Sequence, residues 1–140
     1  MGSGKSKNVN DKDMFVERLE KGGPLVQSLF ESLKQRSLEV CNSNDWGYTD
    51  KPDFRIAFQE TICELVPMLR PPSVRIILRV DRQDPASLIE SLPMITVEDV
   101  SEERPGHRWI KFSITSEDQV DEAIELIQNV YSARDKLGNW

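Results

Sequence analysis

Basic and aromatic side chains alternate with apolar ones in three segments, and this spacing could create a ligand-binding surface. The segments are DFRIAFQ, SVRIILRV and HRWIKFSIT, and each has the two-residue period of a β-strand. Successive side chains of a strand point to opposite faces, so the apolar set predicts a core face and the rest an outer face. The outer face would carry Arg55, Arg75, Arg79, Trp109 and Lys111.

These cations and the aromatic ring suit several kinds of ligand. Guanidinium and ammonium groups attract anions, and aromatic faces stack on bases, so an anionic ligand, a single-stranded nucleic acid and an acidic protein surface all fit. Trp46 and Tyr48 lie in the polar segment 42–52 and would contribute from a loop. The alternative is a solvated sheet face, covered by long side chains or by a second copy in a homodimer.

Acidic residues gather around the first two predicted strands, at Asp50, Asp53, Glu60 and Glu64. A restriction-type nuclease places an acid on one strand and Glu-x-Lys on the next, so that two carboxylates hold Mg²⁺ and the lysine steadies the attacked phosphate. Neither Glu60 nor Glu64 has a lysine two positions later. The spacing therefore disfavours such a nuclease and predicts solvated strand ends and turns.

The nucleophilic side chains do not form a recognisable catalytic set. The chain has two cysteines, Cys41 and Cys63, and one histidine, His107, which lies in a Pro-Gly turn without an evident orienting partner. A single histidine excludes the H-E-x-x-H zinc motif, and no G-x-S-x-G nucleophile elbow occurs. We expect two reduced thiols, no metal and no cofactor. A hydrolase or nuclease accessory with an unassembled site remains the alternative.

The first seven residues, MGSGKSK, carry two short signatures. A phosphate-binding loop needs a glycine five positions before Gly4 and a buried strand before that, and the sequence offers neither. The pattern also fits N-myristoylation at Gly2, which would make the protein a lipid-anchored membrane adaptor. One acyl chain binds membranes only weakly, so a disordered leader or an expression scar is the simpler interpretation.

Composition places the chain among ordinary globular proteins. It has 140 residues, a formal net charge of −6 and a mean hydropathy of −0.49. No apolar run approaches the roughly 20 residues of a membrane span. The negative charge disfavours non-specific binding to nucleic acid. We expect a cytoplasmic protein with one domain over residues 13–137, behind a disordered leader at 1–12.

Periodicity predicts helices at both ends of the domain. A short helical pattern begins at Met14, Gly22-Gly23-Pro24 separates it from a second helix to about Val40, and a third begins behind a Ser116–Gln119 capping box. Between them, TICELVPML predicts a strand with Pro67 at an edge or bulge, ASLIESL one or two helical turns, MITVEDV a short strand and SEERPG a turn. Short connections favour antiparallel pairing.

The predicted fold is therefore α+β: a mostly antiparallel sheet of about five strands, with the N-terminal and C-terminal helices packed on one face.

Two stretches carry a resemblance to a known family. TDKPDFRIAFQETICELVPMLRPPSVRIILRVDRQDP and FSITSEDQVDEAIELIQNVYSA resemble a small bacterial and archaeal domain of unknown function, often labelled "predicted transport protein". That domain occurs alone or fused to restriction-like nuclease modules and has no established reaction. The resemblance implies an accessory or recognition domain in nucleic-acid processing or defence, although this chain has fewer lysines on the second and third strands.

Together, the residues and the resemblance predict a non-catalytic binding or interaction module that uses a basic and aromatic sheet face.

Overall fold

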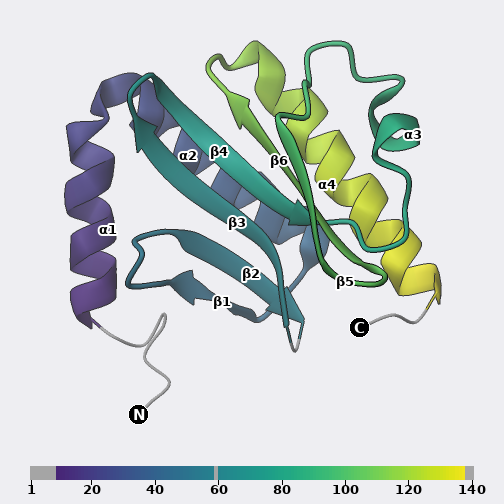
Figure 1. The fold of residues 1–140 in the computed structure, drawn as a ribbon. Helices are drawn as coiled ribbons and strands as arrows, with labels where there is room; N and C mark the ends of the chain where they lie inside the picture. The colour runs from purple at the N-terminus through teal and green to yellow at the C-terminus, as the bar shows by residue number, and fades with distance from the viewer. Residues whose placement is uncertain (1–8, 59, 138–140) are drawn as a thin grey trace.

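The computed structural model describes residues 9–58 and 60–137 (Figure 1). Its centre is a six-stranded antiparallel sheet in the order β1-β2-β3-β4-β6-β5. The elements are α1 (Val9–Lys21), α2 (Gly23–Cys41), β1 (Asp45–Tyr48), β2 (Phe54–Phe58), β3 (Glu60–Leu69), β4 (Pro72–Arg79), α3 (Pro85–Ile89), β5 (Asp99–Arg104), β6 (His107–Ile114) and α4 (Asp118–Leu137).

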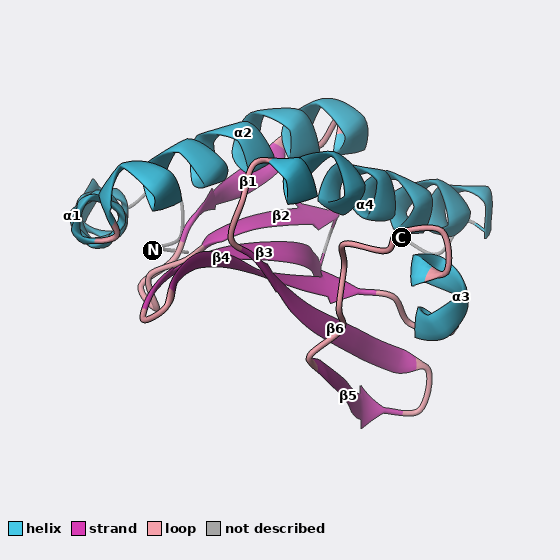
Figure 2. Cartoon of the chain, turned by 90° about the horizontal axis from the view of Figure 1, so that it is seen from above, coloured by secondary structure: helices cyan, strands magenta, loops and turns pink. Residues whose placement is uncertain are grey.

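The helices α1, α2 and α4 lie on one face of the sheet, and α3 packs against α4 (Figures 1 and 2). The apolar halves of the alternating strands pack beneath them and are fully buried, including Phe54, Ile76, Ile110 and Phe112. No described helix covers the other face of the sheet (Figure 2). The predicted α+β class, the antiparallel sheet and the one-sided helix layer are confirmed.

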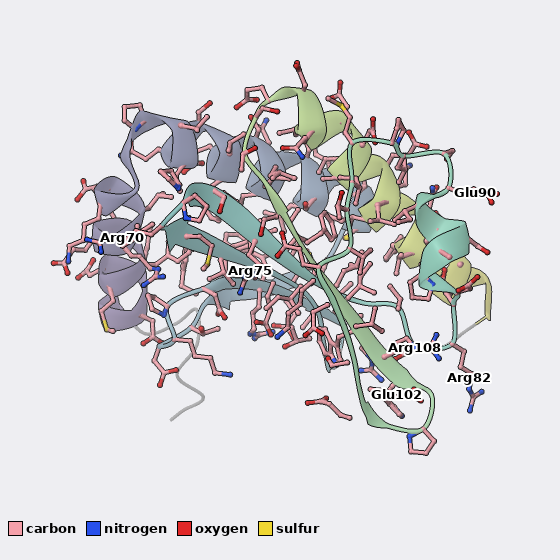
Figure 3. The ribbon with its side chains drawn as sticks, turned by 45° about the horizontal axis from the view of Figure 1, so that its top comes forward. Arg70, Arg75, Arg82, Glu90, Glu102 and Arg108 are labelled. Atoms are coloured by element: carbon pink, nitrogen blue, oxygen red, sulfur yellow. The ribbon has the colours of Figure 1, made fainter. Side chains whose placement is uncertain are left out.

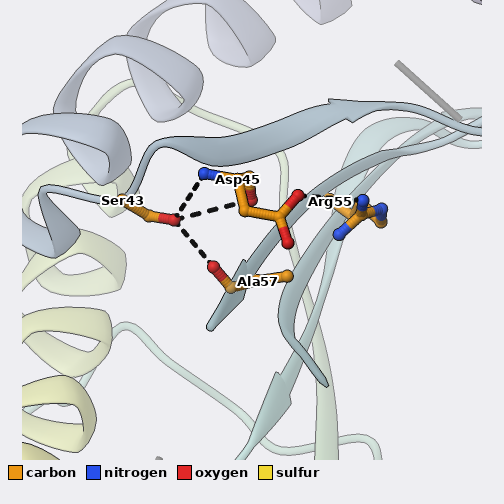
Figure 4. A network of polar contacts seen from close by, with 4 residues as sticks. All are labelled: Ser43, Asp45, Arg55 and Ala57. Atoms are coloured by element: carbon orange, nitrogen blue, oxygen red, sulfur yellow. Dashed lines mark hydrogen bonds and ion pairs between the residues drawn. The ribbon is translucent and has the colours of Figure 1, made fainter. Parts of the chain in front are cut away.

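The sheet gains its sixth strand from the segment predicted to be a loop. β1 pairs with β2 in the register Asp45 opposite Ala57 and Tyr48 opposite Phe54. Ser43 fixes the entry to β1, because its hydroxyl donates to the Ala57 carbonyl at 2.7 Å and accepts from the Asp45 amide (Figure 4). The four residues of β1 are too few to show a period of two, which is why the sequence does not reveal this strand.

The other edge strand also differs from the sequence-based prediction. In the predicted strand MITVEDV (residues 94–100), only Asp99 and Val100 belong to a strand. The segment Ser101–Arg104, predicted to be a turn, continues that strand as the rest of β5. Only Pro105 and Gly106 form the turn, where Gly106 has a φ of +82° that favours glycine. Glutamate and serine disfavour strands intrinsically, so pairing with β6 determines this conformation.

The helix boundaries reflect local chemistry. α1 begins at Val9, so residues 9–12, expected in a disordered leader, are helical, and Asp11 is buried. Gly23 has a φ of +85°, which turns the chain from α1 into α2 as the Gly-Gly-Pro sequence predicts. At the start of α4, the Gln119 side chain accepts hydrogen bonds from the amides of Thr115 and Ser116, which is the glutamine half of the predicted capping box.

Pro67 occupies an interior position of β3 without breaking the sheet. β2 pairs with β3 only as far as Leu65, so Pro67 lies beyond the end of the β2 ladder. On that side, the Arg18 Nε of α1 donates to the Pro67 carbonyl at 2.8 Å. Proline has no amide hydrogen, but at this position the sheet does not need one for its hydrogen-bond ladder.

Candidate ligand-binding face

The uncovered side of the sheet, called the open face below, carries the five strand residues that the sequence predicts for it. The register places Trp109 opposite Arg79 and Lys111 opposite Ile77. A complete row of the open face crosses all six strands, in the order Gly47, Arg55, Glu64, Ile77, Lys111 and Asp99. The period-two prediction therefore places these side chains correctly, and the register adds their neighbours.

Two of the predicted cations are buried and already paired. The Arg79 Nε donates to Asp81 at 2.8 Å, and its Nη2 lies 2.6 Å from the Nδ1 of His107. Because a guanidinium only donates hydrogen bonds, Nδ1 of His107 is the acceptor. This gives His107 the orienting partner that the sequence did not reveal. Arg79 therefore holds the loop after β4 to the β5–β6 hairpin.

Arg55 has a comparable structural role between β1 and β2. Its Nη2 lies 3.1 Å from the Asp45 Oδ1, and its side chain is only 11% exposed (Figure 4). Asp45 is also anchored by Ser43 through its backbone. The charge of Arg55 is therefore directed toward the β1 edge and away from its cross-strand neighbour Glu64.

The remaining cations of the open face are less constrained. Arg75 lies near the centre of the sheet (Figure 3), with its Nη2 3.8 Å from a Glu98 oxygen. Its Nε is buried and has no hydrogen-bond acceptor among the described residues. Lys111 is half-buried and forms no ion pair with another described residue. Trp109 is half-buried beside it.

Trp46 and Tyr48 do not join this set. They lie opposite Ile56 and Phe54, so both side chains point to the helix-covered side of the sheet. Tyr48 is buried, and its hydroxyl accepts a hydrogen bond from the Lys34 Nζ of α2 at 3.0 Å. The same ammonium lies 5.3 Å from the Trp46 ring centroid. These two aromatic residues join the β1 edge to α2.

Glu64 was predicted as part of a solvated strand end or turn, but it lies within β3 on the open face and is half-buried. Its pKa is raised from 4.5 to about 7, mainly by partial burial and also by the charge and hydrogen bond of the Asp53 carboxyl, while Lys51 and Lys111 lower it. Thr49 donates a short hydrogen bond to Asp53. Glu64 is therefore partly protonated near neutral pH, and it hydrogen-bonds to the Asp53 carboxyl. The alternation in TICELVPML contained the signal, because Glu64 falls between the core residues Cys63 and Leu65.

The other candidate chemistries lack a site in the described part of the chain. Burial raises the pKa of Cys41 to about 12 and that of Cys63 well above its usual value, so both thiols stay protonated. No group of three or more histidine, cysteine, aspartate or glutamate side chains among the described residues could hold a metal ion. Gly2 and the rest of MGSGKSK lie outside the described residues.

Comparisons with known protein families, with curated proteins and with solved structures each find no significant match. The resemblance to the "predicted transport protein" domain therefore stays a prediction. Among the described residues, no helix is both long enough and apolar enough to cross a membrane.

Proposed function

We propose that this chain is a non-catalytic binding module whose open face takes a protein partner. The observation that carries the proposal is the one-sided layer: three helices lie on the same face of the sheet, and the opposite face keeps half-buried apolar side chains. These are Val66, Met68, Ile77 and Trp109. A sheet face that meets only water normally alternates to polar residues, so apolar side chains there favour an interface.

The charges on the open face favour protein over nucleic acid. Arg55 and Arg79 each have an aspartate partner, and Arg75 has Glu98. Binding to a phosphate backbone depends on cations that release counterions, and paired arginines contribute little to this. Glu64 and Lys111 give the centre of the face both signs of charge, which suits a protein surface of mixed charge.

A photo-crosslinking side chain tests the proposal directly. Replacing Ile77 by p-benzoylphenylalanine places the reactive group at the centre of the open face, and replacing the exposed Glu125 of α4 places it on the helix layer. We expect illumination in the producing cells to give discrete adducts from position 77 and none from position 125. Intact mass and peptide mapping of the adducts identify the partner.

Equal labelling from both positions, or no adduct from position 77, would overturn the proposal. A labelled oligothymidylate supplies the nucleic-acid comparison by fluorescence anisotropy. Salt-dependent binding that Arg75→Ala and Lys111→Ala both weaken would replace the protein partner by single-stranded nucleic acid.

A further inference from the structure

The charges in the central row of the open face are arranged antisymmetrically about Ile77. On one side of Ile77 lie Glu64 and then Arg55, and on the other side lie Lys111 and then Asp99. Read outward from Ile77, the signs are negative then positive on one side, and positive then negative on the other. No other described side chain forms an ion pair with Glu64 or Lys111.

We propose that the open face binds a second copy of this chain, with a two-fold axis parallel to β4 passing by Ile77. Such an axis reverses the strand order of the second copy and keeps its strand direction. Glu64 of each copy then faces Lys111 of the other, and Ile77 faces Ile77. In the outer positions Arg55, already paired with Asp45 of its own chain, lies opposite Asp99 of the other copy. The inference rests on the proposed function, because it names the occupant of the same face.

The charge pattern selects this axis over the other two-fold axis that would stack the sheets. An axis across the strands would place Glu64 on Glu64 and Lys111 on Lys111, which is repulsive at both positions. The proposed axis runs along β4, so it also places Arg75 near Arg75 and Arg79 near Arg79 of the second copy. Each has a carboxylate of its own chain, Glu98 and Asp81, so neither brings a bare charge to the interface.

The size of the open face is sufficient for a specific dimer. With about 3.3 Å per residue and about 4.8 Å between strands, the six strands cover about 650 Å². Two stacked faces would bury about 1,300 Å² in total, at the lower end of the range for specific interfaces. An interface of this size predicts a dimer whose association depends strongly on its central charge pairs.

The test uses two charge reversals, one on each side of Ile77. In Glu64→Lys, both central contacts of a homodimer become lysine against lysine, and in Lys111→Glu both become glutamate against glutamate. Each variant alone should therefore associate more weakly than the wild-type protein. When the two are mixed, every central contact joins opposite charges, so a heterodimer should form. The weakening by each single reversal and the rescue by mixing must occur together. If each position faced its own counterpart, the wild-type contacts would already join like charges and a single reversal would not change that.

Sedimentation velocity and native mass spectrometry measure the association over a concentration series. We expect wild-type protein to dimerise, each reversal to weaken association at least about tenfold, and the equimolar mixture to restore it to near the wild-type value. The matched control reverses the Arg36–Asp121 ion pair of the helix layer, through Arg36→Glu and Asp121→Lys, and should leave the dimer unchanged.

The contrary results are distinct. A wild-type chain that stays monomeric, a dimer indifferent to both reversals, or a mixture without a heterodimer each overturns the inference. If either reversal prevents folding, as circular dichroism would show, Glu64→Gln and Lys111→Met replace it, and each should weaken the dimer about threefold. If position 77 crosslinks to a different protein and the chain itself is monomeric, the proposed function stands and the homodimer inference is wrong.

Discussion

Ile76 and Ile77 are consecutive residues of β4 with the same side chain, yet they belong to different regions of the molecule. Ile76 is fully buried beneath the helices, whereas Ile77 is half-buried on the open face. The covered face is held by close packing of apolar side chains. On the open face Arg55, Arg75 and Arg79 form ion pairs around a few apolar residues. The comparison shows that one strand supplies both the stability of the fold and its binding surface.

The largest expected effect separates the two isoleucines. Ile76→Ala should lower the free energy of unfolding by about 4 kcal/mol, because it leaves a cavity in a closely packed core. Ile77→Ala should cost about 1 kcal/mol in the monomer, because the surroundings of Ile77 are open on one side. Urea denaturation at low protein concentration measures both. Equal losses for the two variants would mean that the open face is covered in solution.

The next effect concerns two cations of the open face. Arg79→Ala should cost about 3 kcal/mol, because it removes a buried guanidinium that pairs with Asp81 and contacts His107. Lys111→Ala should change the free energy of unfolding of the monomer by less than about 0.5 kcal/mol, since its ammonium makes no ion pair within the described chain. Urea titrations of the two variants at one pH make the comparison. Equal losses for the two variants would contradict the separation into structural and binding cations.

The smallest effect is a pH dependence that originates at Glu64. Its folded pKa of about 7 lies above the unfolded value of 4.5, so the folded protein binds more protons in this interval. The stabilisation is complete below about pH 4.5 and is lost as the pH rises through about 7. Because solvent screens the partly exposed carboxyl, we expect this change in the free energy of unfolding to be about 1 kcal/mol in the wild-type protein. Glu64→Gln should remove it. Urea titrations at pH 5.5 and about pH 8.5 compare the two proteins.

Association between copies should respond to pH in the opposite direction. Ionised Glu64 attracts Lys111 of the second copy, so dimerisation should strengthen as the pH rises through about 7. The groups that set this titration within one chain are Asp53, Lys51 and Lys111, with Arg55 held away by Asp45. Sedimentation velocity across the same pH series separates the two trends, and Glu64→Gln should abolish both.

Much of the covered face could be predicted from the sequence. In SVRIILRV the alternation alone separates the buried set from Arg75, Ile77 and Arg79, because strand geometry sends successive side chains to opposite faces. The Gly-Gly-Pro break between α1 and α2 could also be predicted from the sequence, since only glycine adopts the φ of Gly23 without strain.

The two edge strands of the sheet, β1 and β5, could not be predicted correctly from the sequence. β1 has four residues, one of them Gly47, and is too short to show a period of two; β5 carries Ser101, Glu102 and Glu103, whose residue types disfavour strands. Hydrogen bonding to β2 and β6 determines their conformation. For the same reason the sequence could not predict which side of the sheet Trp46 and Tyr48 face, because a residue predicted to lie in a loop is assigned to no face.

The sequence by itself determined which side chains leave the core, because alternation is a local property of the extended chain. It also determined where α1 gives way to α2, which depends on the backbone freedom of a glycine. Only the tertiary structure decided which of these side chains meet, because register is set by pairing between distant segments. That pairing leaves Glu64 and Lys111 on either side of Ile77, and it turns Arg55 and Arg79 toward aspartates of their own chain.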